Sequence, residues 1–349
     1  MLYGLPNPHG GDIYGGDVTL DFSANTNPFG TPEGVRRAVQ AAMLDMDRYP
    51  DPYCRRLVEK IAEFEGIDRD YILCGNGAAE LIYAYCAAVR PKTALEPVPT
   101  FSEYAQGLEQ AGCRVKYYYL TPDNDFALNG RFVDYLTETL PEAVFLCNPN
   151  NPTGRLTDPG LLKEILETCR ENEICLFVDE CFLDLSDDGQ SLKGYLADYP
   201  NLFLLKAFTK SYGMAGVRLG YCLSSRRELL KAMAQAVQPW NVSGLAQAAG
   251  VAALDEGAFL AETRALIQTE RLWLRQKLEA FGFRVFPSQV NYLLFQGSET
   301  LHADLKRRGI AIRNCSNYPG LTAGWYRIAI RRHEENEALI AAIGSCLEG

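Results

Sequence analysis

The sequence of 349 residues contains only three histidines, His9, His302 and His333, which lie far apart along the chain. This scarcity disfavours a histidine-based metal centre. The 11 cysteines are scattered, include no Cys-x-x-Cys pair, and often lie in apolar runs. Reduced thiols that pack as small hydrophobic side chains explain this pattern better than a metal site or a disulfide framework does. We therefore expect no bound metal.

Positive charge and long apolar runs are also scarce. The formal net charge is -10 at pH 7 and no basic cluster offsets it, which argues against electrostatic binding of nucleic acid. No apolar stretch approaches the roughly 18 residues of a membrane span. The start, Met1–Gly4, is not the charged-then-apolar pattern of a signal peptide. We expect a cytoplasmic protein that binds neither nucleic acid nor membrane and holds anionic substrates through local groups.

The chain is long enough for one large core and a smaller domain, with 47% hydrophobic and 22% charged residues. Between residues 71 and 222, short aliphatic runs alternate with helical patterns, which predicts an α/β domain whose mostly parallel central sheet is flanked by helices. The continuous apolar runs at 144–147, 176–178 and 202–205 indicate strands that are buried on both faces.

After residue 257 the pattern changes to a long charged amphipathic helix, strands at 290–295, 310–313 and 326–330, and a final helix from about residue 334. This pattern indicates a smaller α+β part. We predict a large domain over residues 49–256, and a small domain formed by residues 1–48 together with residues 257–349.

Two polar segments follow predicted strands, at the edge where open α/β sheets bind ligands. Gly75–Glu80 opens a helix and offers free backbone N–H groups to a phosphate, although taken alone it is more simply a tight turn. Asn151 follows the strand at 144–147, and its amide is able to donate a hydrogen bond to a phenolate oxygen. The Asn-Pro pairs around it are also explained by turn formation alone.

Two charged residues follow the next two strands. Asp179 would be buried, and a protonated pyridine nitrogen is a cationic partner that would offset the cost of its burial. A helix cap is the weaker alternative, because apolar residues follow. Lys210 has apolar neighbours that lower the pKa of an amine and allow a Schiff base with an aldehyde. Lys206 is the alternative lysine, and taken singly either lysine is more simply a solvated surface residue. The spacing to Arg218, a forked donor for a phosphate dianion, favours Lys210.

In their chain order, Ser23–Asn27, Asn148–Gly154, Asp179–Phe182 and Thr209–Arg218 resemble the fold-type I pyridoxal-phosphate enzymes of the class I/II aminotransferase superfamily, over nearly the whole chain. The resemblance implies pyridoxal 5′-phosphate as the cofactor and a homodimer. It implies that Lys210 forms the Schiff base, that Asp179 pairs with the pyridine nitrogen, and that Asn151 bonds the 3′-oxygen of the ring. The further cofactor contacts that it implies are Ala78, Ala79, Thr209 and Arg218 at the phosphate, Phe101 stacked on the ring, and Tyr49 at the phosphate of a neighbouring subunit.

Within the superfamily, the chain resembles the L-threonine-O-3-phosphate decarboxylases and the histidinol-phosphate aminotransferases. His9–Gly11, Leu20–Pro28, Ile312–Leu321 and Tyr326–Arg331 are similar to segments of the decarboxylases. Aminotransferases usually place a tyrosine three residues after the aspartate. Here that residue is Phe182, as in the decarboxylases. Ala207 stands where a phosphate-binding hydroxyl is common, so phosphate binding would depend more on Thr209, Arg218 and the helix N-terminus.

The resemblance implies a phosphorylated amino acid or amino alcohol as the substrate. The first expectation is decarboxylation of L-threonine O-3-phosphate in cobalamin biosynthesis, and the alternative is transamination of histidinol phosphate with 2-oxoglutarate. Arg327 matches a carboxylate-binding arginine. Arg313 and Arg331 are candidates for the substrate phosphate, with His9 and Asn25 as weaker ones. An exposed strand end is the plainer interpretation of Arg331, and a flexible tail that of His9. A DNA-binding regulator fits poorly with the acidic charge and the short N-terminal arm.

Overall fold

A seven-stranded sheet forms the centre of the computed structural model, which describes residues 9–348. The segment Met1–Gly4, used above to judge a leader sequence, lies outside this range. The strands lie in the order β2 (Ile72–Gly75), β8 (Gly220–Leu223), β7 (Leu202–Ala207), β6 (Cys175–Asp179), β5 (Ala143–Cys147), β3 (Thr93–Val98) and β4 (Arg114–Tyr119). The strands from β7 to β4 are parallel, whereas β8 is antiparallel to both of its neighbours. The predicted mostly parallel α/β sheet is confirmed.

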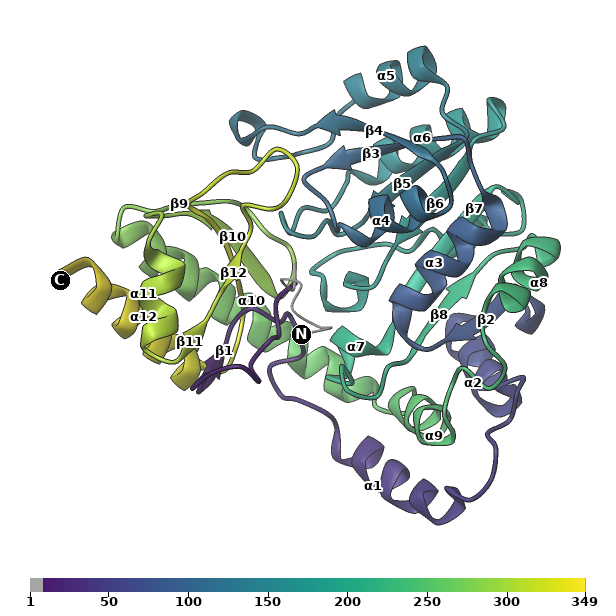
Figure 1. Cartoon of the computed structure of the whole chain (residues 1–349), viewed down its shortest axis with the longest axis horizontal. Helices are drawn as coiled ribbons and strands as arrows, with labels where there is room; N and C mark the ends of the chain where they lie inside the picture. Colours follow the sequence, from purple (N-terminus) through teal and green to yellow (C-terminus); the bar gives the residue numbers. More distant parts are fainter. Residues whose placement is uncertain (1–8, 349) are drawn as a thin grey trace.

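Helices cover both faces of this sheet (Figure 1). One face carries Phe145, Phe177 and Phe203, which form one core with α3 (Gly77–Val89), α4 (Glu103–Gln110) and α8 (Arg227–Ala236). The other face packs against α2 (Arg55–Glu65), α5 (Arg131–Thr139), α6 (Pro159–Glu171) and α9 (Gly244–Ala253). Burial on both faces explains why the central strands are continuously apolar in sequence.

A second sheet lies beside the first (Figure 1). Its antiparallel strands follow the order β12 (Arg313–Asn314), β13 (Trp325–Ala329), β10 (Tyr292–Gln296) and β9 (Arg284–Val285), and the helices around it are α10 (Gly257–Ala280), α11 (Leu301–Arg307) and α12 (His333–Glu348). The single strand expected over 310–313 is wrong. It is two short strands, because β11 (Ile310–Ala311) pairs with β1 (Leu20–Asp21) while β12 pairs with β13.

The N-terminal arm contacts both parts of the fold. Its strand β1 joins the C-terminal part, whereas α1 (Glu33–Ala42) packs against α9 beside the large sheet. The domain boundaries at residues 48 and 256 therefore stay a prediction. Within residues 9–348, no helix is long and apolar enough to cross a membrane, and no cluster of His, Cys, Asp or Glu side chains is arranged to hold a metal ion.

Candidate active site

A cavity of about 440 Å³ opens at the carboxyl ends of β5, β6 and β7, facing β12 and β13. Such strand ends are the usual ligand-binding edge of an open α/β sheet. The cavity brings together twelve of the residues singled out from the sequence, namely His9, Asn25, Ala78, Ala79, Phe101, Asn151, Asp179, Thr209, Lys210, Arg218, Arg313 and Arg327.

Lys210 lies in α7 (Phe208–Ser211), the short turn that follows β7. Burial lowers the pKa of Lys210 to about 8, and the nearby Arg327 guanidinium lowers it as well. The Nζ atom lies 5.6 Å from the centre of the Phe182 ring. An amine with this pKa is partly neutral near pH 7, which makes it a nucleophile for an aldehyde.

Asp179 is buried at the end of β6. Burial raises the pKa of this carboxyl group, while hydrogen bonds from Cys181 and Tyr104 lower it. The Tyr104 hydroxyl donates to Oδ2 at 2.6 Å, and the backbone N–H of Cys181 donates to Oδ1 at 2.8 Å. Tyr104 was not predicted from the sequence, because its contact with Asp179 depends on how α4 packs against the sheet.

A turn with room for an anion joins β2 to α3. Gly77 has a φ of +79°, and a Cβ atom at this position would lie 2.6 Å from Nη2 of Arg218. A Cβ atom at Gly220 would lie 2.8 Å from the backbone nitrogen of Ala78. Glycine at both positions therefore lets a guanidinium group and a helix N-terminus approach the same point, which is an arrangement that binds phosphate.

Arg313 and Arg327 lie directly opposite each other on β12 and β13, and both are buried. Arg327 Nη2 donates to the carbonyl oxygen of Ser23 at 2.8 Å, and Arg313 Nη2 donates to Oδ1 of Asn317 at 2.7 Å. Within residues 9–348, no carboxylate lies within ion-pair distance of either guanidinium group. Like charges directly across a strand pair are unfavourable, so this arrangement calls for an anion in the cavity.

The side-chain amide of Asn151 is oriented by Arg327. Arg327 Nη1 donates to the side-chain oxygen of Asn151. The NH₂ end of the amide therefore remains as the end that is able to donate to a ligand. This orientation agrees with the hydrogen-bond donation expected from the sequence.

Two further polar side chains line the cavity. His9 Nε2 lies 2.8 Å from Oε1 of Glu103, and the Tyr83 hydroxyl donates to Oε2 of the same carboxylate at 2.7 Å. This contact favours a place in the site over the interpretation of a flexible tail. Asn25 is 1% exposed, and neither its Oδ1 nor its Nδ2 has a hydrogen-bond partner. Its unsatisfied amide suits a polar ligand.

Three residues from the sequence analysis lie outside the cavity. Tyr49 is 79% exposed and stacks on Trp240 with 4.5 Å between the ring centres, so its contact with a neighbouring subunit stays a prediction. Arg331 lies beyond the end of β13 with Nε 3.5 Å from Oε1 of Glu335, which corrects the expectation that it lines the site. Lys206 is buried away from the cavity, which supports Lys210 as the reactive lysine.

Residues 17–343 match the sequence family described as aminotransferase class I and II. The chain belongs to this family. It is therefore a pyridoxal-phosphate-dependent enzyme with the fold-type I architecture. The chemistry of the cavity fits this cofactor, because an amine of lowered pKa, a buried carboxylate and an anion-binding turn meet there.

Known class I and II members show similarity to the chain along most of its length. It is 36% identical to threonine-phosphate decarboxylase from Salmonella typhimurium, over 95% of this chain and 92% of that protein. It is 31% identical to histidinol-phosphate aminotransferase from Caldanaerobacter subterraneus subsp. tengcongensis, over 93% of this chain and 92% of that protein. The histidinol-phosphate aminotransferase structure from Clostridium acetobutylicum superposes with a TM-score of 0.87 at 28% identity, covering 94% of this chain and 99% of that one.

Proposed function

We propose that this enzyme decarboxylates L-threonine O-3-phosphate to (R)-1-aminopropan-2-yl phosphate and carbon dioxide, in cobalamin biosynthesis. The main support is the buried pair of Arg313 and Arg327, which lines the same cavity as Lys210 and has no carboxylate partner within residues 9–348. The proposed substrate carries a carboxylate and a phosphate, so one molecule would satisfy both guanidinium groups. The similarity to the Salmonella typhimurium decarboxylase agrees with this proposal.

When bound, pyridoxal 5′-phosphate supplies an electron sink that allows a bond at the α-carbon of the substrate to break. In our proposal, Lys210 would bind its aldehyde, and Asp179, held by Tyr104, would keep its ring nitrogen protonated. Phe101 would pack against the ring, while the Asn151 amide would donate to the ring oxygen. Arg218, Thr209 and the backbone at Ala78 and Ala79 would hold the phosphate group.

The substrate is oriented by the arginines from the second sheet. Arg327 holds the carboxylate through two parallel hydrogen bonds, which fixes the direction of the bond that breaks. Arg313, with His9 and Asn25, binds the substrate phosphate. Lys210 Nζ, released when the substrate amine takes its place on the cofactor, would supply the proton that replaces carbon dioxide on the α-carbon.

The alternative is transamination of histidinol phosphate, which is the activity named for the 31% identical relative. Histidinol phosphate has no carboxylate, so it would leave one buried guanidinium group unpaired in that half of the reaction. Phe182, which lines the cavity without a hydroxyl group, also favours decarboxylation over transamination. In both cases we infer a homodimer in which Tyr49 reaches the cofactor phosphate of the other subunit.

Product analysis tests the proposal directly. The cofactor-loaded protein is incubated with O-phospho-L-threonine in the absence of any keto acid, and carbon dioxide and the phosphorylated amino alcohol are measured. Catalytic release of both products is the expected result. No release, together with 2-oxoglutarate-dependent turnover of histidinol phosphate in a parallel reaction, would replace the proposal with the aminotransferase.

Variants of the arginines test how the substrate is held. Arg313→Gln and Arg327→Gln should each lower kcat/KM by roughly thirtyfold or more, because each leaves a substrate anion without its buried partner. Arg331→Gln is the matched control, because Arg331 lies outside the cavity. Equal losses in all three variants would contradict the assignment.

A further inference from the structure

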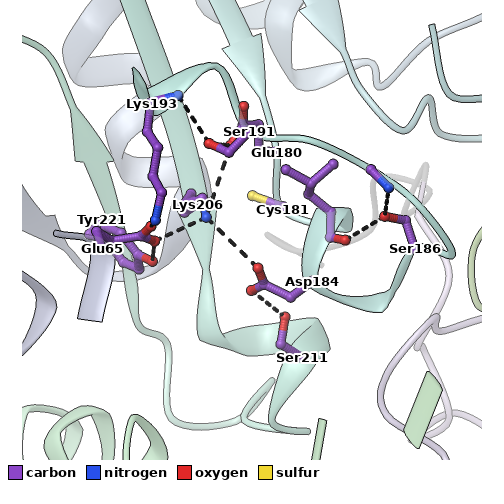
Figure 2. A network of polar contacts seen from close by, with 12 residues as sticks. Glu65, Glu180, Cys181, Asp184, Ser186, Ser191, Lys193, Lys206, Ser211 and Tyr221 are labelled. Carbon is purple, nitrogen blue, oxygen red and sulfur yellow. Dashed lines mark hydrogen bonds and ion pairs between the residues drawn. The ribbon is translucent and has the colours of Figure 1, made fainter. Parts of the chain in front are cut away.

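Lys206 lies at the centre of a buried ionic cluster, which Figure 2 shows. Successive strand residues point to opposite faces, and Ala207 lines the cavity, so the Lys206 side chain points away from it. Lys206 Nζ lies 3.0 Å from Oε1 of Glu65, 3.8 Å from Oδ1 of Asp184 and 3.9 Å from Oε2 of Glu180. The side chains of Lys206, Glu65 and Glu180 are at most 6% exposed.

Further groups satisfy the carboxylates of this cluster. Glu65 also accepts hydrogen bonds from Lys193 Nζ at 2.8 Å and from the Tyr221 hydroxyl. Glu180 accepts from the Ser191 hydroxyl at 2.7 Å and from the backbone N–H of Leu192 at 2.9 Å. Burial alone would lower the pKa of Lys206, but the surrounding carboxylates raise it above its ordinary value.

Stability alone does not account for such a cluster. A buried ion pair is often no more stabilising than well-packed apolar residues of the same volume, because desolvation offsets the attraction between the charges. What the charges do provide is a fixed geometry, because both oxygens of Glu65 and both oxygens of Glu180 accept directional hydrogen bonds. The residues that this cluster contacts indicate its role.

The cluster includes residues that are adjacent in sequence to Asp179 and Lys210. Glu180 directly follows Asp179, and Ser211 directly follows Lys210. The Ser211 hydroxyl donates to Oδ2 of Asp184 at 3.1 Å, as Figure 2 shows. On the other side of the turn, Asn27 Nδ2 donates to the carbonyl oxygen of Ser211 at 2.8 Å. A single helical turn such as α7 is not rigid alone, so these contacts fix its position.

We propose that Lys206 is a positioning residue, which sets the placement of Lys210 through Asp184 and Ser211 and that of Asp179 through Glu180. This inference rests on the proposed role of Lys210 as the cofactor-binding lysine. A displacement of about 1 Å is enough to lower a catalytic rate roughly a hundredfold. The cluster thus links two residues that face the cavity to a common support behind the sheet.

Two serine variants provide the sharpest test. Ser211→Ala removes only the hydroxyl that joins α7 to Asp184. Ser224→Ala is the matched control, because Ser224 is equally buried and its hydroxyl donates at 3.2 Å to the carbonyl oxygen of Leu202, at the opposite end of β7. Lys206→Met removes the central charge, and Lys206→Arg keeps a cation that is able to meet the same carboxylates.

Two quantities are measured on the cofactor-loaded proteins. The first is the pH midpoint of the visible absorbance of the adduct between Lys210 and pyridoxal phosphate, and the second is kcat and KM for O-phospho-L-threonine. Ser211→Ala should move the midpoint by about half a pH unit or more and lower kcat roughly tenfold, with little change in KM. Ser224→Ala should change neither quantity. Lys206→Met should exceed Ser211→Ala in both effects, and Lys206→Arg should restore the wild-type midpoint.

The absorbance midpoint does not depend on decarboxylation. If the wild-type protein forms the adduct but releases no carbon dioxide, the proposed function fails while the midpoint comparison still decides this inference. If Ser211→Ala keeps the wild-type midpoint, or shifts it no more than Ser224→Ala does, the positioning role is refuted. That comparison decides the matter even if Lys206→Met does not fold. If Lys210 forms no adduct, the function and the inference both fall.

Discussion

In the cofactor-free protein, Lys210 should react with electrophiles near neutral pH. Burial lowers its pKa from the ordinary 10.5 to about 8. At pH 7.5 roughly a quarter of the Lys210 amine is then neutral, compared with about one part in a thousand for an ordinary lysine. The difference in reactive fraction is therefore about two hundredfold, which is large enough to measure.

Arg327→Gln tests the electrostatic part of this shift. The Arg327 guanidinium is the largest cause of the lowered Lys210 pKa after burial, and removing its charge favours the protonated amine. The pKa of Lys210 should therefore rise towards 10.5, and the neutral fraction at pH 7.5 should fall. Glutamine retains most of the length of the side chain without the charge.

Trace acetylation across a range of pH, followed by peptide mass spectrometry, reports the titration of Lys210 directly. The exposed Lys163 on α6 serves as the internal reference in the same digest. A wild-type midpoint near 10 would refute the argument from burial. A midpoint that falls in Arg327→Gln would show that the sign of the electrostatic argument is wrong.

Three further changes test other parts of the structure. Burial raises the pKa of Glu96 to about 8 from an ordinary 4.5, so the stability due to its protonated form is complete below about pH 4.5 and is lost as the pH rises through 8. Denaturant unfolding should show that the free energy of unfolding of the wild-type protein falls by on the order of 3 kcal/mol between pH 6 and 9, and that Glu96→Gln lacks this fall. Equal falls in the two proteins would contradict the role of Glu96. Tyr104→Phe removes a hydrogen bond to Asp179, so equilibrium dialysis should show cofactor affinity that is lower by about tenfold or more, and unchanged affinity would argue against this role. Phe182→Tyr adds a hydroxyl group beside Lys210 and should increase conversion of the cofactor to its amine form, which absorbance measures. If the ratio of this conversion to carbon dioxide release stays at the wild-type value, the role of Phe182 is contradicted.

The sequence was sufficient to predict the large sheet and most of the cavity. Polar segments stand directly after continuous apolar strands, and parallel strands bring their carboxyl ends to one edge, so Asn151, Asp179 and Lys210 were expected to meet. These predictions needed only the local pattern and the chain order. The same reasoning also led to the anion-binding turn before α3.

Residues placed by tertiary register were not predictable in this way. Arg313 and Arg327 lie opposite each other because of the register between β12 and β13. A loop separates these two strands, so the register cannot be deduced from the local sequence. Arg331 was expected at the substrate phosphate, but it lies beyond the end of β13 and its side chain pairs with Glu335 instead of lining the cavity. Tyr104 contacts Asp179 only because α4 packs across the sheet, and that packing is invisible in a single sequence.

The pairing of β2 with β8 has a consequence for the order of folding. Gly75 lies opposite Gly220, so the turn proposed to hold the cofactor phosphate is next to a strand made about 145 residues later. Contacts this distant in sequence form slowly, and until β8 emerges from the ribosome β2 has no sheet to join. Strand β2 therefore stays without its sheet partner while the roughly 145 residues between Gly75 and Gly220 are synthesised. Cofactor capture becomes possible only when the last central strand has closed the sheet.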